Sequence, residues 1–484
     1  MSDKNKEMNR EIYENPLITR YASKEMAENF SDDKRFRLWR KLWIALAESE
    51  KELGLDITDG QIAELKKYAD DVNYEDAAAF EKEVRHDVMA HVKAYGKQAT
   101  SAAGIIHLGA TSCFVTDNAE IIMVDDALDT VLEKLVNVVN NLKNFAGRYK
   151  DMPTLGFTHC QPAQLVTVGK RACLWIQDLL SDIDALVSLK DSVKLRGVKG
   201  TTGTQASFME LFDGDGEKVK LLEKKVVNKM GYDKVFAVTG QTYPRKFDYA
   251  VLSVLSQIAQ SAYKFANDIR LLQSMKEIEE PFESTQIGSS AMAYKRNPMR
   301  SERMCALARF VVTLPLNTAI TSSTQWFERT LDDSANKRIV TAQAFLAVDG
   351  ILKLYMNISE NLVVYEKMIE KHVREELPFM ATENIIMECV KAGKDRQKMH
   401  EEIRKISMKA AENVKLYGKE NNTIDLIKQN AEFAAVHDRL SDILDPKKYV
   451  GRAPRQVEEF IAEDVDPVLK KYSGFIGLKA EISL

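Results

Sequence analysis

Cysteine, proline and glycine are scarce in this chain, and each scarcity excludes a class of protein. The 484 residues contain 5 Cys, 11 Pro and 22 Gly. The cysteines are odd in number, scattered and never spaced Cys-x-x-Cys, which is typical of reduced thiols and not of a disulfide framework. So few turn-forming residues disfavour a turn-rich β protein and favour long helices.

The chain also lacks a strong net charge, a leader-like start and long apolar runs. Its 68 Lys and Arg against 72 Asp and Glu give a net charge of −4. A general nucleic-acid binder is disfavoured, because neutralising phosphates requires a basic face. Residues 1–16 hold no apolar core of a signal peptide, and no uninterrupted apolar run approaches the length of a membrane span. We therefore expect a cytoplasmic protein without membrane or nucleic-acid partners.

Common metal, nucleotide and hydrolase motifs are missing as well. His86 and His91 are five residues apart, so on a helix they would point about 140° apart and not form a zinc-binding pair. The glycine-rich segment 195–208 has no Gly-x-x-x-x-Gly-Lys pattern, which leaves a flexible inter-helix connection or a substrate contact as its role. Gly288-Ser289-Ser290 is not a Gly-x-Ser-x-Gly nucleophile elbow. These absences predict no metal site and disfavour a covalent serine hydrolase.

Long stretches with apolar residues every three or four positions dominate what is present. Such stretches cover residues 35–54, 117–145, 162–195, 244–279 and 334–356. Asp117 with Glu120 three residues on resembles a capping box, and Pro162 and Pro244 are expected to open their helices. Long helices bury little surface unless they pack side by side. The pattern therefore predicts an all-α fold with a long central helical bundle.

The length of the predicted helices changes twice along the chain. Residues 1–111 mix short helical patterns with loops, 112–364 carry the long helices, and 365–484 return to shorter helices and polar loops. We predict three helical domains with these bounds. The long helices carry apolar residues beyond one stripe, so we expect leftover surface that is covered in a homo-oligomer.

Two polar segments are candidates for a functional site. Residues 286–303, QIGSSAMAYKRNPMRSER, gather basic side chains around the single acid Glu302. In residues 326–338, WFERTLDDSANKR, Arg329 precedes a helix start at Ser334 and Arg338 lies one turn further. A helix N-terminus with a hydroxyl and two guanidiniums suits a phosphate or carboxylate.

Each candidate has a simpler interpretation. Asp332 and Asp333 would repel an anion, and an ordinary capped helix with surface ion pairs explains residues 326–338 equally well. His86, His107 and His159 lie in loop-like segments beside small polar residues. A lone loop histidine is more often a surface or satisfied core group than a catalyst.

Taken together, these segments resemble the aspartase/fumarase superfamily of fumarate-forming lyases. The superfamily loop GSSxMPxKxNPxxxE matches Gly288 to Glu302, with Ala293 where the family usually has proline. The segments RHDVMAHV, AAGIIHLGATS, PTLGFTHCQPAQ, RGVKGTTGTQASF, QWFERTLDDSAN and ELPFMATENIIM are similar to the animal-type adenylosuccinate lyase family. The likeness covers essentially the whole chain.

The resemblance implies a fold of three largely helical domains, a homotetramer with active sites shared between subunits, and no cofactor. It implies β-elimination of fumarate from adenylosuccinate, giving AMP, and from succinylaminoimidazole carboxamide ribotide in purine biosynthesis. Ser289 would be the general base and His159 the general acid, with His86 and Lys295 assisting. The substrate-binding positions that it implies are Arg20, Tyr21, Arg85, His86, Asp87, Thr111, Ser112, Thr158, Gln241, Lys295, Asn297, Arg303, Arg329, Ser334 and Arg338.

Two alternatives stay open. Another lyase of the superfamily, acting on argininosuccinate, fumarate or aspartate, would bind a substrate without phosphate, and the cluster of Arg329, Ser334 and Arg338 with Arg20 disfavours it. A catalytically silent structural protein on the same scaffold would have no need of Ser289, His159, Lys295 and Glu302.

Overall fold

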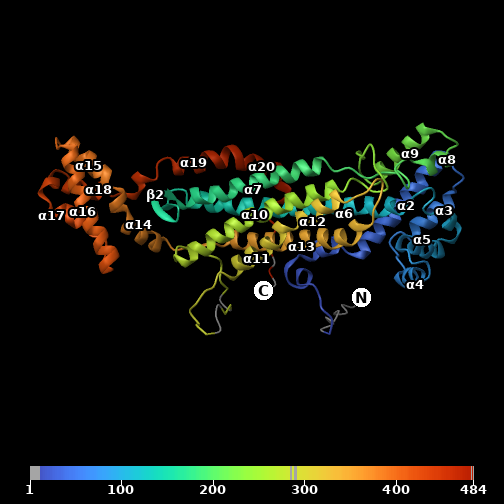
Figure 1. Ribbon diagram of the computed structural model, residues 1–484, viewed down its shortest axis with the longest axis horizontal. Coiled ribbons are helices and arrows are strands. Elements are labelled where there is room, and N and C mark those ends of the chain that lie inside the picture. Colours follow the sequence, from blue (N-terminus) through green and yellow to red (C-terminus); the bar gives the residue numbers. More distant parts are fainter. Residues whose placement is uncertain (1–10, 284–285, 288–290, 481, 483–484) are drawn as a thin grey trace.

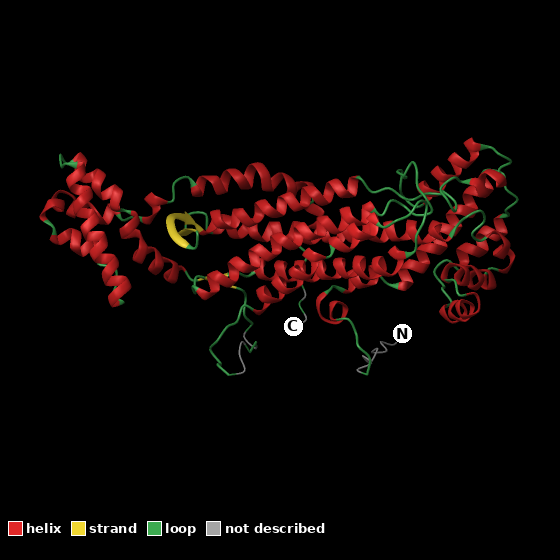
Figure 2. Ribbon diagram, in the orientation of Figure 1, coloured by secondary structure: helices red, strands yellow, loops and turns green. Residues whose placement is uncertain are grey.

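Long helices lie side by side in the middle of the molecule, with a smaller helical lobe at each end (Figures 1 and 2). The computed structural model describes residues 11–283, 286–287, 291–480 and 482. The all-α prediction is confirmed, and the strands within this described part are short: β1 with β2, and β3 with β4.

The N-terminal lobe follows local capping signals. Ser31 accepts a hydrogen bond from the Lys34 amide and so starts α2, three residues earlier than the apolar pattern predicts. The helix buries the stripe of Trp39, Leu42 and Trp43, and the Trp39 and Trp43 rings meet His91 and Tyr95 of α5. The elements of this lobe are η1 (Leu17–Tyr21), α1 (Lys24–Asn29), α2 (Asp32–Glu52), α3 (Asp59–Lys67), α4 (Tyr74–Val84), α5 (Asp87–Gln98) and η2 (Thr100–Ile105).

The central bundle is built on the 37-residue helix α6. It begins at Ser112, so the capping box expected at Asp117 is wrong: Asp117 is 1% exposed and lies inside the helix. The helices around it are amphipathic and bury their apolar faces on one another. The elements of this part are α6 (Ser112–Arg148), α7 (Val168–Asp191), α10 (Lys246–Ser274), α11 (Met299–Thr313), α12 (Pro315–Ser323) and α13 (Asp332–Glu360). Two helices between α7 and α10 in the chain, α8 (Ala206–Leu211) and α9 (Gly216–Lys229), lie with the N-terminal lobe, where α9 packs beside α2 (Figure 1).

A β-hairpin interrupts the helices after α6, where a helix opened by Pro162 was expected. Pro162 lies in β2 (Gln161–Thr167), opposite Phe157 of β1 (Pro153–Thr158). A two-stranded sheet has an open edge on each side, so a strand without one N–H is tolerated there. Thr167 then caps α7 by accepting a hydrogen bond from the Lys170 amide.

The glycine-rich connection after α7 is packed, which argues against a flexible linker. Arg196 and Lys199 are buried, and the Lys199 ammonium pairs with Glu223 at 2.6 Å. Gly203 has φ of +83°, and a side chain there would collide with the Thr239 carbonyl. The segment therefore runs against the loop 238–242, which enters the site described below.

The second lobe has its own buried cluster, which runs from Ala381 to Ile443 and is separate from the main core. After it the chain returns along the bundle, where α19 lies beside α7 (Figure 1). The predicted domain bounds stay a prediction. The remaining elements are β3 (Ile278–Glu279), β4 (Val363–Val364), α14 (Glu366–Met380), α15 (Thr382–Lys391), α16 (Arg396–Tyr417), α17 (Thr423–Gln429), η3 (Ala431–Arg439), α18 (Leu440–Ile443), η4 (Pro446–Tyr449), α19 (Ala453–Phe460), η5 (Ile461–Val465), α20 (Asp466–Lys471) and η6 (Ser473–Phe475).

Two helical stretches of the bundle are apolar and long enough to span a bilayer by length and composition alone. They are Met299–Ser323 and Asp332–Glu360, each with mean hydropathy 1.4. In the second stretch 72% of the most apolar window is buried inside the molecule. Core helices of helical bundles have the same composition, so these stretches are weak support for a membrane span.

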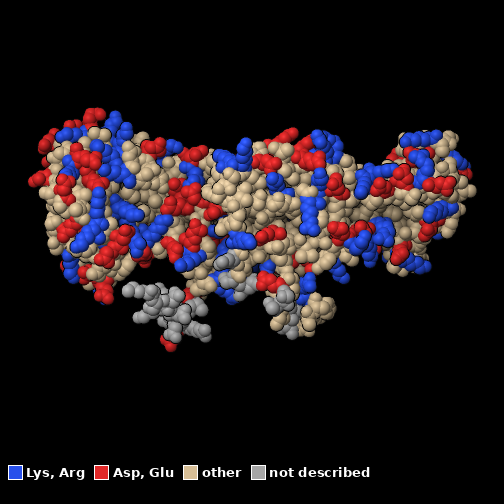
Figure 3. All heavy atoms as spheres, turned by 180° about the vertical axis from the view of Figure 1, so that it is seen from behind, with Lys and Arg blue, Asp and Glu red and all other residues tan. Residues whose placement is uncertain are grey.

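Apolar side chains also remain at the bundle surface. Leu271, Leu316, Ile320 and Ile339 are each more than half exposed. Seen from behind, the middle of the molecule carries fewer charged side chains than its two ends (Figure 3). Surface of this kind is typical of a helical bundle that packs against further copies.

Candidate active site

A cavity of about 420 Å³ lies where α5, α6 and α13 begin. Helix N-termini present unpaired N–H groups and a positive dipole end, which suits an anionic ligand. The expected substrate-binding residues that line it are His86, Asp87, Ser112, Gln241, Arg329, Ser334 and Arg338.

His86 is fixed by hydrogen bonds on both ring nitrogens. It is the N-cap of α5, and its Nδ1 accepts from the Met89 amide at 3.3 Å. Its Nε2 lies 3.2 Å from the Ser112 hydroxyl. A nitrogen that accepts carries no proton, so neutral His86 has its proton on Nε2 and donates it toward Ser112.

Gln241 enters the cavity from the loop before α10. Its side-chain Nε2 donates to Thr111 Oγ1 at 3.2 Å. Its backbone carbonyl accepts from Arg196 at 2.7 Å, and its amide donates to the Glu328 carbonyl at 2.9 Å. The buried Arg196 therefore ties this loop to the glycine-rich connection, and the Gln241 amide ties it to the segment that carries Arg329.

The acids at the start of α13 do not face the cavity as free charges. Asp333 is buried, and its two oxygens each lie 2.7 Å from a guanidinium, that of Arg329 and that of Arg245. Asp332 turns to the preceding loop and accepts from Thr324 at 2.7 Å. The N-cap of α13 makes no side-chain hydrogen bond, so the interpretation of an ordinary capped helix is wrong.

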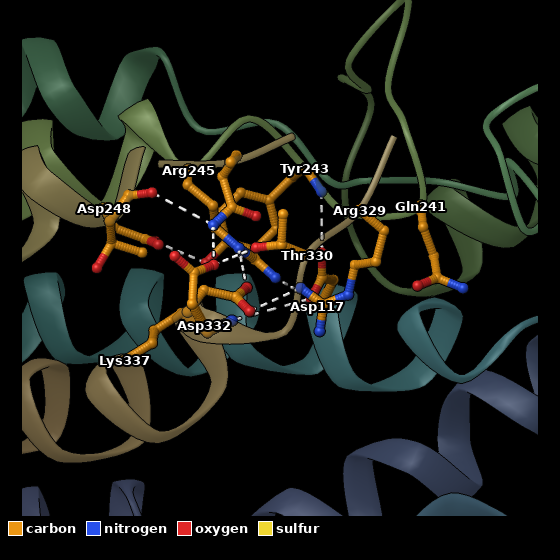
Figure 4. Close-up of polar contacts among 12 residues, drawn as sticks. Asp117, Gln241, Tyr243, Arg245, Asp248, Arg329, Thr330, Asp332 and Lys337 are labelled. Atoms are coloured by element: carbon orange, nitrogen blue, oxygen red, sulfur yellow. Dashed lines mark hydrogen bonds and ion pairs between the residues drawn. The ribbon is translucent and has the colours of Figure 1, made fainter. Parts of the chain in front are cut away.

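A buried network continues behind Arg329 (Figure 4). Arg245 donates to Asp117 Oδ1 at 3.1 Å, and Asp117 Oδ2 accepts from the Tyr243 amide at 2.9 Å. Burial by itself would raise the pKa of the Asp117 carboxyl, but nearby Arg245 and Lys337 outweigh it and lower that pKa. Asp117 is therefore ionised, and the network joins α6, α10 and α13 behind the cavity.

His107 belongs to the core and not to the site. Its Nδ1 accepts from the Trp43 indole at 2.9 Å. Burial, and to a smaller extent the nearby His86, lower the pKa of His107 to about 4. It is a neutral, satisfied group at physiological pH.

A second group of expected residues lies along α13. Arg303 of α11 stands 5.8 Å from the ring centroid of Tyr21, and Arg20 lines the same small groove. A side chain at Gly350 would contact Tyr21 Cβ at 3.0 Å, so α13 is notched there to admit the N-terminal segment. Asp349 holds that segment by accepting from the Ser23 amide at 2.5 Å.

The general acid expected from the resemblance stands at the tip of the hairpin. Thr158 pairs with Gln161, which leaves His159 and Cys160 as a two-residue turn with φ of +53° and +57°. Positive φ at both positions is typical of the type I′ turn that matches strand twist. Histidine and cysteine meet a steric penalty in this region, and such strain concentrates at functional positions. The imidazole of His159 is exposed.

The polar loop after β3 is held firmly at its base. Glu280 accepts from the backbone amides of Arg300 and Ser301 at 2.9 and 2.8 Å, and so caps the start of α11. Lys295 is exposed, and Asn297 is half-buried just before the helix. Ser289, the expected general base, lies outside the described residues.

Within one chain these groups are far apart. Residues at the start of α6 line the cavity, whereas the hairpin follows the end of that helix, on the opposite side of the bundle in Figure 1. The 37 residues of α6 span about 55 Å at 1.5 Å per residue. His86 and His159 of the same chain therefore cannot reach one small molecule.

The likeness to known proteins covers the cavity and the hairpin alike. The sequence model of the family described as Lyase matches residues 19–313, and that of Adenylosuccinate lyase C-terminus matches residues 378–460. The adenylosuccinate lyase of Saccharomyces cerevisiae is 54% identical over 467 residues, which cover 96% of this chain and 97% of the yeast protein. That of Schistosoma mansoni is 48% identical, over 98% and 99% of the two chains. This chain belongs to the adenylosuccinate lyase family.

Solved structures agree with this family in fold. The 3-carboxy-cis,cis-muconate lactonizing enzyme of Pseudomonas putida matches with a TM-score of 0.79 and 22% identity, over 94% of this chain and all of that one. The fumarate lyase of Mesorhizobium sp. BNC1 matches with a TM-score of 0.77 and 20% identity, over 93% of this chain and all of that one. At such identities the likeness shows the fold alone.

Several cavity residues of this adenylosuccinate lyase family member were missed by sequence reasoning. They are Arg35, Phe36, Asp117, Glu120, Arg245, Asp333 and Lys337. One signal was available for Asp117, which is a charge on the apolar face of a long helix and so needs a buried partner. In the described part of the chain, no cluster of three or more His, Cys, Asp or Glu could hold a metal ion.

Proposed function

We propose that this protein cleaves adenylosuccinate to AMP and fumarate, and succinylaminoimidazole carboxamide ribotide to its carboxamide ribotide and fumarate. The observation that carries this proposal is the likeness to adenylosuccinate lyases over nearly the full length of both chains. The arginines beside the start of α13 support a substrate with a phosphate, which argues against the lyases that act on argininosuccinate, fumarate or aspartate.

The elimination needs a base for carbon and an acid for nitrogen. Ser289 would take the proton from the carbon next to a carboxylate, which builds up a doubly negative aci-carboxylate. Lys295 and Asn297 would stabilise that charge with a cation and an N–H donor. The C–N bond then breaks, the new double bond gives fumarate, and His159 donates its proton to the departing nitrogen.

The cavity would bind the nucleotide. Arg329, Ser334 and Arg338 offer the phosphate two guanidiniums and a hydroxyl near the start of α13. His86 would position the substrate and support His159, while Thr111, Ser112 and Gln241 supply neutral donors and acceptors. Arg85 and Asp87 would complete the contacts at this cavity. Arg20, Tyr21 and Arg303, which lie in a separate groove along α13, and Thr158 of the hairpin would be contributed by other copies of the chain.

We infer that complete sites form only in a homotetramer. About 55 Å of helix separates the cavity from the hairpin of its own chain, so the hairpin that serves a cavity must come from another copy. The exposed apolar side chains of the bundle support such packing. We further propose a cytoplasmic enzyme that uses no cofactor or metal.

A two-substrate assay tests the function. Purified protein is incubated with adenylosuccinate, and AMP and fumarate are followed by absorbance and chromatography. With succinylaminoimidazole carboxamide ribotide as substrate, the carboxamide ribotide and fumarate are followed instead. Turnover of both substrates is expected, and a folded tetramer without product would overturn the proposal in favour of a silent scaffold.

Mixing two inactive variants tests the shared site. Ser289→Ala and His159→Ala should each be inactive, and mixed tetramers should regain activity, because some sites then combine a wild-type serine with a wild-type histidine. Mixed tetramers that stay inactive would argue against sites shared between chains.

A further inference from the structure

Asp333 lies between two guanidiniums of different character. Its Oδ1 is 2.7 Å from Arg329 and its Oδ2 is 2.7 Å from Arg245. The Asp333 side chain is 1% exposed and that of Arg245 is 3% exposed, whereas that of Arg329 is 24% exposed. Only Arg329 of these three therefore presents a substantial surface to solvent in the cavity.

Arg245 is itself fixed from behind. It donates to Asp117 and lies 4.3 Å from the ring centroid of Tyr243, whose hydroxyl donates to Asp248 at 2.6 Å. Burial by itself would lower the pKa of the Arg245 guanidinium, but Asp117, Tyr243, Asp248 and Asp333 outweigh it and raise that pKa well above its usual value. Arg245 thus stays charged, and Asp333 keeps a permanent partner when Arg329 turns to a ligand.

We propose that Asp333 is a positioning residue that aims the Arg329 guanidinium at the substrate phosphate while Arg245 neutralises its own charge. The proposal rests on the proposed function. Because Asp333 is buried and both of its oxygens lie 2.7 Å from a guanidinium, its carboxylate does not face the phosphate as an unpaired charge. A guanidinium that is ordered before binding loses less conformational freedom when the ligand arrives.

The neighbouring Asp332 offers a matched control. It carries the same charge one residue earlier, but it is exposed and accepts from Thr324, Gln325 and Thr330, not from a cation. Replacing either aspartate by asparagine removes one negative charge from the same turn. Only the change at Asp333 takes away the ion pair that orients Arg329.

The experiment compares Asp333→Asn with Asp332→Asn in the intact oligomer. We measure KM and kcat with adenylosuccinate, and the Kd of AMP by calorimetry. Asp333→Asn should raise KM and the Kd of AMP about tenfold, the loss expected for one charged hydrogen bond, with kcat changed less than about threefold. Asp332→Asn should change each value less than about twofold. Equal effects of the two variants, or a fall in kcat with KM unchanged, would overturn the proposal.

A double-mutant cycle separates positioning from a merely structural role. If Asp333 acts through Arg329, Asp333→Asn should add little to the loss of AMP affinity in an Arg329→Gln protein. Losses that multiply would show that Asp333 does not act through Arg329.

Two further measurements keep the proposal testable. If Asp333→Asn does not fold, Arg245→Lys is tested instead, because lysine keeps the positive charge but lacks the Nε–H that Arg245 donates to Asp333. Arg245→Lys should raise the Kd of AMP and largely keep kcat. An unchanged Kd would overturn the proposal. AMP binding needs no turnover, so a wild-type protein that binds AMP without cleaving adenylosuccinate would contradict only the proposed function.

Discussion

The cavity at the start of α13 and the tip of the β1–β2 hairpin are held in place in opposite ways. In the cavity, side chains are fixed by ion pairs that run back into the core, as from Arg329 through Asp333 to Arg245. At the hairpin tip, His159 is exposed and its position depends on a backbone turn with positive φ.

The difference shows what one chain can complete alone. Buried ion pairs need a core around them, because a charge that loses its hydration must be stabilised by charged or hydrogen-bonding partners. The cavity has that core within its own chain. The hairpin tip is exposed, so under the proposed function the groups that orient the imidazole would come from the substrate and from other copies of the chain.

The largest effect on turnover is expected for His159→Gln at the hairpin tip. Turnover should fall by about 10²–10⁴-fold, the usual contribution of a general acid, while AMP still binds to the cavity. The tip is exposed, so the melting temperature should hardly change. His400→Gln, on the exposed surface of α16, makes the same substitution away from the site and should keep full activity. Equal activity of the two variants would remove His159 from the mechanism.

A smaller effect on turnover is expected for Gly156→Ala, which should move the hairpin while His159 itself is unchanged. A side chain at Gly156 would lie 2.5 Å from the Gln164 carbonyl across the sheet, and backbone cannot yield as a flexible side chain can. Gly156→Ala should therefore shift the strands and lower turnover at least about tenfold through misplacement of the imidazole. Gly147→Ala in α6 meets no atom within 4 Å and should leave activity intact. Full activity of Gly156→Ala would mean that hairpin geometry does not position the acid.

Helix faces were readable from the sequence, because burial repeats with the period of the helix. The stripe of α2 and the apolar positions of α6 lie in the core as expected. The motif segments, through the family resemblance that they carry, also indicated seven of the side chains around the cavity. These are properties that a short window of sequence contains.

Contacts between distant segments were not readable. Asp117 has the local pattern of a cap, but its carboxylate binds the Tyr243 amide and Arg245, which are 126 and 128 residues away. Pro162 has a fixed φ that suits a helix start and an edge strand alike, and only its pairing with Phe157 decides for the strand. The sequence motifs likewise contain no distance, so they do not show that His86 and His159 of one chain lie at opposite ends of α6.

The smallest expected effect on activity concerns a buried carboxyl group of the N-terminal lobe that, unlike Asp333, has no side-chain partner among the described residues. Glu50 is fully buried, and neither carboxylate oxygen has a hydrogen-bond partner among the described residues; burial raises its pKa to about 9. Above the ordinary pKa of glutamate, the unfolded protein releases the Glu50 proton, whereas the folded protein still binds it. The contribution of Glu50 to stability is therefore lost as the pH rises toward 9. The unfolding free energy of the wild-type protein should therefore fall between pH 6 and 8.5. Glu50→Gln should make this fall smaller by about 1 to 3 kcal/mol, measured by urea midpoints at fixed protein concentration, with turnover unchanged.

Glu52, on the same helix, is the control. Hydrogen bonds from Lys225 and Lys229 lower its pKa to about 2, so its contribution to stability is lost only in acid. Glu52→Gln should therefore leave the pH dependence between pH 6 and 8.5 unchanged. A wild-type pH dependence in Glu50→Gln would show that the Glu50 carboxyl is already ionised in the fold.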